Sequence, residues 1–91
     1  MYQIHWASRF RRDVKLCEKR RKDMSKFKHI HEFLAHGKSL PPQNRDHNLG
    51  GVWRGCRECH IEPDWLLIYR ISEKEGILEY VRMGTHSDLF R

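Results

Sequence analysis

Hydrophobic residues recur with two different periods along this chain. Near its start, large apolar and polar residues alternate over residues 2–6, a pattern typical of a short strand. Strand-like runs return later and cover residues 53–61, 65–71 and 77–83. Short polar turns separate these three runs, which predicts an antiparallel meander. The middle run begins with five consecutive apolar residues, so it is apolar on both faces and we expect it to be the central strand.

Between the first strand and the meander, apolar residues recur every three or four positions, which predicts two helices. The first covers residues 8–22 with Ser8 as its expected N-cap, and the second covers residues 24–36 and ends before Gly37. Residues 37–51 are rich in Gly, Pro and Asn and predict a loop. Each helix has one narrow apolar stripe, so both need a sheet to pack against. The stripes are Phe10, Val14 and Cys17 in the first helix, and Phe27, Ile30 and Leu34 in the second.

The order of these elements, a strand, two helices and three further strands, predicts an α+β fold. We expect an antiparallel sheet of about four strands with the two N-terminal helices packed on one face. A chain of 91 residues can bury one small core and not two. Residues 1–91 are therefore expected to form a single domain.

The charge of the chain is high and unevenly distributed. Charged residues make up 33% of the sequence, and the formal net charge is +6. Residues 1–38 contain 11 Lys and Arg against 4 Asp and Glu, whereas residues 39–91 are nearly balanced. A basic half favours docking on a polyanion, although a solvated helix face is the plainer alternative. Because no long apolar run is present, we expect no signal peptide, no membrane span and a cytoplasmic location.

Residues 56–60 match C-x-x-C-H, the pattern at which c-type haem is attached. In a strand, residues three apart point to opposite faces, so Cys56 and Cys59 cannot easily hold one porphyrin. A zinc site is also disfavoured, because no second Cys or His pair has zinc-finger spacing. We therefore expect no metal and no cofactor, and we expect these cysteines to be small strand residues.

Three histidines, His47, His60 and His86, lie beside predicted turns rather than on one helical stripe. Imidazole titrates near neutral pH, so a cluster of histidines can both accept and donate protons. With Asp64 and several arginines nearby in the sequence, this set suits acid–base chemistry on an anionic phosphate. Taken singly, each residue has a plainer explanation as a surface histidine or a turn-forming aspartate.

Several longer segments resemble the YafQ-type toxins of the RelE/ParE superfamily of toxin–antitoxin systems. The most specific are H-x-E-P-D-W at residues 60–65 and G-T-H-x-x-L-F at residues 84–90. Residues 13–16, 19–24, 45–49, 51–69 and 82–90 extend the resemblance over nearly the whole chain. The resemblance implies a RelE-like fold and a ribosome-dependent mRNA interferase that needs no metal. It also implies three partners: a cognate antitoxin, expected to be a ribbon-helix-helix protein, the 70S ribosome and mRNA.

Metal-free RNA cleavage uses the 2′-hydroxyl as nucleophile and needs a base, an acid and cationic donors around the phosphorane. The catalytic residues that the resemblance implies are His47, His60, Asp64 and His86. Among them, His86 is expected to act as the acid and Asp64 or His60 as the base. The residues expected to bind substrate are Arg54, Arg57, Trp65, Arg82 and Phe90. For Trp65, packing in the core and stacking on a base both remain open.

The basic face of the first helix is expected to contact ribosomal RNA rather than the cleaved message, because it lies far from the site in the sequence. Its residues are Arg11, Arg12, Lys15, Lys19 and Arg21. Two alternative functions remain open. A gyrase-inhibiting toxin would share the fold without needing proton carriers, and the His/Asp cluster argues against it. A non-catalytic RNA- or DNA-binding module would use the histidines only to contact phosphate.

Overall fold

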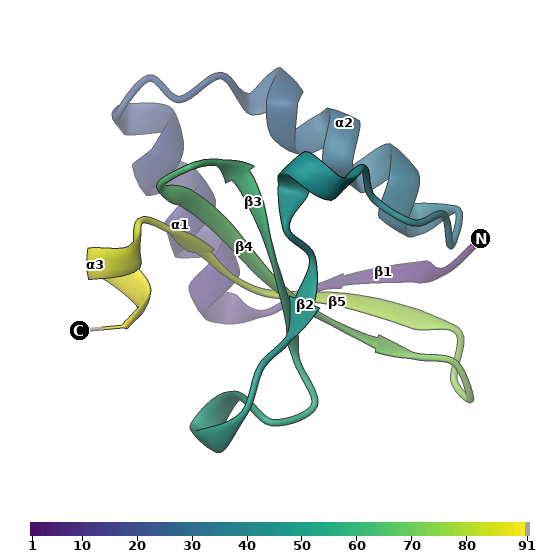
Figure 1. Cartoon of the computed structure of the whole chain (residues 1–91). Helices are drawn as coiled ribbons and strands as arrows, with labels where there is room; N and C mark the ends of the chain where they lie inside the picture. The colour runs from purple at the N-terminus through teal and green to yellow at the C-terminus, as the bar shows by residue number, and fades with distance from the viewer. Residues whose placement is uncertain (91) are drawn as a thin grey trace.

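The computed structural model describes residues 1–90, in which two helices cover one face of a five-stranded sheet (Figure 1). The strands are β1 (Gln3–Trp6), β2 (His47–Asn48), β3 (Arg57–Glu62), β4 (Trp65–Ser72) and β5 (Ile77–Gly84). The helices are α1 (Ser8–Lys19), α2 (Met24–Ala35) and the short α3 (His86–Leu89), and the 3-10 turns are η1 (Pro42–Asn44) and η2 (Gly51–Trp53). The α+β class is confirmed. No helix within residues 1–90 is long and apolar enough to span a membrane.

The strand order is β1-β5-β4-β3-β2, so β4 is the central strand as predicted, and its first five residues are all buried. Strands β3, β4 and β5 form the predicted antiparallel meander. The expectation of about four antiparallel strands is wrong in two respects. Strand β1 pairs in parallel with β5, and β2 adds a fifth strand against β3. The direction of β1 depends on the path of the chain through α1 and α2, and the two-residue β2 is too short to show any alternation.

The main core lies between the sheet and helices α1 and α2, and it contains both predicted apolar stripes. A smaller cluster covers the opposite face of the sheet and consists of Cys56, Leu66, Ile68 and Leu89. Because Cys59 belongs to the main core, the prediction that Cys56 and Cys59 face opposite sides is confirmed. Leu89 buries its side chain in the smaller cluster and so attaches α3 to this second face.

Helix α1 differs from the prediction at both ends. Its N-cap is Ala7 rather than Ser8. Ala7 follows β1 directly, and its backbone N–H still belongs to the sheet, because it donates to the carbonyl of Tyr80 in β5 at 3.0 Å. The helix ends at Lys19 and not at residue 22. Two residues later Arg21 adopts a left-handed backbone conformation with φ of 62°, which cannot continue a right-handed helix.

Helix α1 also covers part of the β5 edge. Strand β1 pairs only with the first four residues of β5, so the rest of that edge needs another partner. Asp13 of α1 supplies it: one carboxylate oxygen accepts the Met83 backbone N–H at 2.9 Å and the Arg82 Nε–H at 2.7 Å. Strand β5 ends at Gly84, just before α3, so this contact lies close to the start of α3.

Candidate active site

The four residues predicted to be catalytic come from four different elements and gather on the face of the sheet opposite α1 and α2. His47 lies on β2, His60 on β3, Asp64 in the β3–β4 turn and His86 at the start of α3. The sheet register places His60 opposite Leu66, which belongs to the smaller hydrophobic cluster of that face. The fold therefore brings together residues that are up to about forty positions apart in the sequence.

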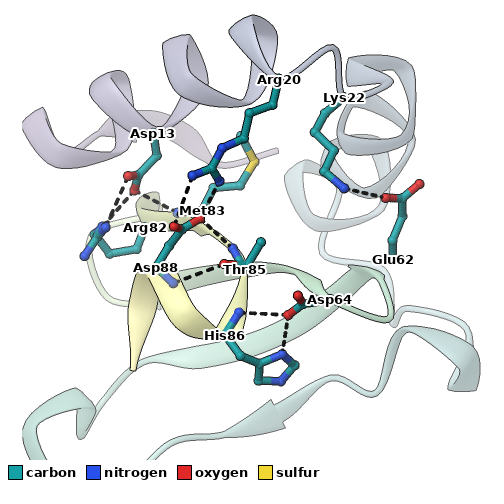
Figure 2. Close-up of polar contacts among 10 residues, drawn as sticks. All are labelled: Asp13, Arg20, Lys22, Glu62, Asp64, Arg82, Met83, Thr85, His86 and Asp88. Atoms are coloured by element: carbon teal, nitrogen blue, oxygen red, sulfur yellow. Dashed lines mark hydrogen bonds and ion pairs between the residues drawn. The ribbon is translucent and has the colours of Figure 1, made fainter. Parts of the chain in front are cut away.

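Asp64 and His86 form a hydrogen-bonded pair (Figure 2). One Asp64 carboxylate oxygen accepts both the His86 backbone N–H, at 2.9 Å, and its ring Nδ1, at 2.6 Å. These two hydrogen bonds, the backbone one first, lower the pKa of Asp64 below its ordinary value. An ionised carboxylate only accepts hydrogen bonds, so Nδ1 carries a proton and Nε2 is left for a substrate.

A buried glutamate connects the other two histidines. Glu58, whose side chain is only 7% exposed, lies with one carboxylate oxygen 3.6 Å from Nε2 of both His47 and His60. Each histidine is oriented from its other nitrogen, because Nδ1 of His47 donates to the Arg45 carbonyl at 2.8 Å and Nδ1 of His60 to the Pro63 carbonyl at 3.3 Å. When either ring is protonated, Glu58 becomes its counter-ion.

Glu58 was not among the residues predicted from the sequence. The signal was present, because residues two apart in a strand share a face and Glu58 precedes His60 by two. A second missed residue is Trp53 in η2, whose ring meets that of Phe90 edge to face with 6.3 Å between centroids. A row of four aromatic rings results, since Phe90 neighbours His86 at 6.5 Å and His86 neighbours His60 at 5.8 Å. Phe90 is 45% exposed, so the row borders solvent.

Trp65 does not belong to this cluster. Its side chain is fully buried in the core between sheet and helices, and the Lys22 ammonium lies 5.5 Å from the ring centroid. The indole Nε1 has no hydrogen-bond partner among residues 1–90. Of the two roles left open, packing is the one that this position allows, and stacking on a base is not available to a ring enclosed in the core.

Two of the three arginines expected to bind substrate are held by carboxylates. Arg82 is 9% exposed and directs Nε and one terminal nitrogen to Asp13, at 2.7 and 3.2 Å (Figure 2). Arg57 donates to Asp46, and it lies opposite Tyr69 of the main core, on the other face of the sheet from Glu58. These ion pairs orient both side chains in the free protein, and the expected role of Arg57 and Arg82 in substrate binding stays a prediction. Arg54, at the end of η2, is exposed.

The five basic residues expected to contact ribosomal RNA are all exposed on or just after α1. These residues are far from the site in the sequence, but the end of α1 is close to it in the fold. Arg20, which lies among them, pairs with Asp88 at 2.7 Å, only two residues beyond His86 (Figure 2). The C-terminal end of α1 is thus a neighbour of the site.

The cysteines offer no thiolate to this site. Cys17, Cys56 and Cys59 are all buried with free thiols, and burial is the main cause that raises the pKa of each one. Within residues 1–90, no three His, Cys, Asp or Glu side chains are arranged to hold a metal ion.

A cleft of about 350 Å³, lined by both polar and apolar groups, opens beside His60. Its walls come from the η1 loop and the β3–β4 turn and include Asn44, Arg45 and Pro63. A larger and mainly apolar hollow of about 460 Å³ lies between α1 and α2, and none of His47, His60 and His86 lines it. The cleft next to His60 offers space for a substrate beside the ring of that residue, and the other three expected catalytic residues do not line it.

Comparisons with known proteins agree with one another. The family model described as "Bacterial toxin of type II toxin-antitoxin system, YafQ" matches residues 2–91. The mRNA interferase toxin YafQ of Escherichia coli strain K12 is 43% identical over 88 residues, which are 96% of this chain and 94% of that protein. The crystal structure of the E. coli DinJ–YafQ complex matches with a TM-score of 0.91 and 41% identity, and covers all of both chains. A metal-bound toxin from Helicobacter pylori matches with a TM-score of 0.93 and 38% identity over 99% of this chain and 100% of that one.

Proposed function

Because this chain belongs to the YafQ family of bacterial type II toxins, we propose that it cleaves translated mRNA on the ribosome by metal-free acid–base catalysis. Its 43% identity to an mRNA interferase over nearly the full length makes it an endoribonuclease. The observation that carries the proposed mechanism is the Asp64–His86 pair facing the ring of His60, with 5.8 Å between the two imidazole centroids.

The proposed reaction is a transesterification within one nucleotide. The 2′-oxygen forms a bond to phosphorus while the bond from phosphorus to the 5′-oxygen breaks. A base takes the proton of the 2′-hydroxyl and an acid gives a proton to the departing 5′-oxygen. The products are a 2′,3′-cyclic phosphate and a 5′-hydroxyl. In the transition state both oxygens are bonded to the same phosphorus, so the acid and the base must lie close together, as His86 and His60 do.

The geometry supports His86 as the acid. Asp64 fixes the ring through Nδ1, which leaves Nε2 to deliver a proton. The base was left open between Asp64 and His60. Asp64 is the weaker choice, because the hydrogen bonds from His86 lower its pKa and occupy one of its oxygens. We therefore assign the base role to His60 and an orienting role to Asp64.

His47 and Glu58 complete the proposed site. As an imidazolium, His47 would place positive charge beside the phosphorane, where negative charge develops. Glu58 would hold His47 and His60 at equal distance and stabilise whichever ring is protonated. Arg54 supplies an exposed cation, and Phe90 an exposed ring on which a base can stack.

The proposal includes three macromolecular partners. The E. coli relative has been crystallised with DinJ, so we propose that this chain is neutralised by a cognate antitoxin, expected to be a ribbon-helix-helix protein. The 70S ribosome and mRNA are the other two. Copurification of the tagged toxin with the product of the adjacent gene tests the antitoxin, and recovery of the toxin alone from cells that express both would contradict it.

The test of the function is cleavage of defined mRNA on programmed ribosomes. We expect codon-positioned cuts with a 2′,3′-cyclic phosphate end, equal activity after treatment with a zinc-selective chelator that spares magnesium, and no cuts without ribosomes. His86→Ala should lower the rate about 10² to 10⁴-fold with an unchanged circular dichroism spectrum. Activity that is lost on chelation and restored by zinc would refute the metal-free mechanism. RNA binding without cleavage, or arrested gyrase, would favour one of the two alternative functions.

A further inference from the structure

The helix that carries His86 is too short to be stable alone. Helix α3 has four residues, whereas isolated helices shorter than about a dozen residues are marginal in water. Its position must therefore be set by contacts with the rest of the molecule. Three such contacts exist: the burial of Leu89, the hydrogen bonds from His86 to Asp64, and an ion pair between Asp88 and Arg20 of the segment that ends α1.

We propose that Arg20 and Asp88 are positioning residues of the catalytic site, which hold α3 so that His86 meets the scissile phosphate in the reactive orientation. This inference rests on the proposed function, in which His86 is the acid. Neither residue touches the substrate in this view, and both act through the backbone of α3.

Asp88 is the centre of the arrangement (Figure 2). Its oxygen Oδ2 accepts the Thr85 backbone N–H at 2.9 Å, while its own N–H donates to the Thr85 hydroxyl at 3.1 Å, which forms a reciprocal cap of α3. The same carboxylate accepts two hydrogen bonds from Arg20, from Nη1 at 2.7 Å and from Nη2 at 3.3 Å. One side chain thus closes the first turn of α3 and ties it to the end of α1.

The fit around this carboxylate is tight. A Cβ atom added to Gly84 would lie 2.8 Å from Asp88 Oδ2 and 2.9 Å from Asp88 Cβ, so only glycine fits at that position. Arg20, through its hydrogen bonds, is the main cause that lowers the pKa of Asp88 to about 2, followed by the Thr85 backbone N–H. The pair therefore stays ionised at any pH at which ribosomes work.

The other end of the contact is also firmly placed. Helix α1 packs its apolar stripe into the main core and binds the β5 edge through Asp13. Arg20 therefore links α3 to a rigid part of the molecule. Without that link, α3 would be held by Leu89 and Asp64 alone, and the His86 ring could move by a fraction of a helical turn. A misplacement of about 1 Å in a catalytic group can cost roughly 100-fold in rate.

The principal test is Arg20→Gln, with Arg9→Gln as a matched control that removes the same charge from the exposed side of the same helix. Single-turnover cleavage on programmed ribosomes gives the maximal rate and the half-saturating toxin concentration separately. We expect Arg20→Gln to lower the maximal rate roughly 10- to 100-fold with little change in half-saturation, and Arg9→Gln to match wild type. Arg20→Lys, which keeps one donor, should recover part of the rate. The NMR signals of the His86 ring should move in Arg20→Gln and not in Arg9→Gln.

A double-mutant cycle gives a second, independent readout. Asp88→Asn keeps an oxygen for the Thr85 N–H but loses the charge, so Arg20→Gln and Asp88→Asn together should be no slower than either alone. Additive losses, or a loss confined to half-saturation, would overturn the proposal and make Arg20 a ribosome contact. A wild-type rate for Arg20→Gln while His86→Ala is inactive would also overturn it and leave the proposed function standing. Full activity of His86→Ala would instead refute the proposed function.

Discussion

The buried ion pair between Asp13 and Arg82 leads to a quantitative prediction about stability. Asp13→Ala would remove the only carboxylate that Arg82 contacts within residues 1–90, and it would leave the Met83 N–H without its acceptor. Both side chains of the pair are about 10% exposed, so solvent cannot replace the lost partner. Removing one partner of a buried pair typically costs about 3–5 kcal/mol. The free-energy cost of the unpaired Met83 N–H is included in that range and is not added to it, because the neighbouring groups relax together.

We therefore expect Asp13→Ala to lower the free energy of unfolding by about 3–5 kcal/mol, a large part of the roughly 5–15 kcal/mol that holds a typical domain folded. Urea unfolding followed by tryptophan fluorescence measures it, since Trp65 lies in the core. Glu18→Ala, an exposed acidic residue of the same helix, should change stability by no more than about 0.5 kcal/mol. Asp13→Asn keeps an acceptor for the Met83 N–H and should lie between the two.

A loss below about 1 kcal/mol for Asp13→Ala would refute this reasoning. It would mean that Arg82 turns to solvent at little cost once Asp13 is gone. In that case Arg82 could also leave Asp13 to contact RNA, and its expected role in substrate binding would gain support.

Three further predictions concern pH, the ribosome and the aromatic row. Since His86 lowers the pKa of Asp64, the stability contributed by that carboxylate should be present above its ordinary pKa of 3.8 and be lost only as the pH falls below it. The difference in melting temperature between wild type and Asp64→Asn should thus shrink as the pH is lowered below 3.8, and a difference that stays undiminished there would contradict the assignment. Replacing the five basic residues of the α1 face by Gln should weaken ribosome cosedimentation and flatten its salt dependence, and unchanged cosedimentation across a salt series would remove that interface. If bases stack on these rings, Phe90→Ala and Trp53→Ala should each weaken binding of mRNA with a 2′-deoxy scissile nucleotide by about 1–3 kcal/mol. Trp53→Phe should restore the affinity. Affinities equal to that of wild type would mean that the rings only pack against one another.

Much of the local structure was predictable because it depends on side-chain periodicity. The apolar stripes of α1 and α2 have the helical period, and the short apolar run at the start of β4 lies between two polar turns, which favours a buried strand. The opposite placement of Cys56 and Cys59 followed in the same way from the alternation along a strand. Each of these predictions depends only on residues close together in the sequence and not on how the chain folds back on itself.

The site itself was only partly predictable. Motif resemblance identified the three histidines and Asp64, and the fold brings these four together. It could not say that Arg57 and Arg82 are held by Asp46 and Asp13, because an ion pair between distant residues leaves no local pattern. It also missed Glu58, which matters because the sheet places the rings of His47 and His60 beside its carboxylate.

The sequence by itself thus determined the helices, the meander, the basic α1 surface and the types of residue available for proton transfer, because each is a property of short segments. The tertiary structure alone decided the parallel pairing of β1 with β5, the enclosure of Trp65 and the contact between Arg20 and Asp88. All three features depend on which distant segments of the chain meet. The two helices and the sheet decide this together, when they bury their apolar faces against one another, and no single element decides it alone. The same packing that encloses Trp65 brings the end of α1 beside His86, so the placement of the candidate acid is a property of the whole fold.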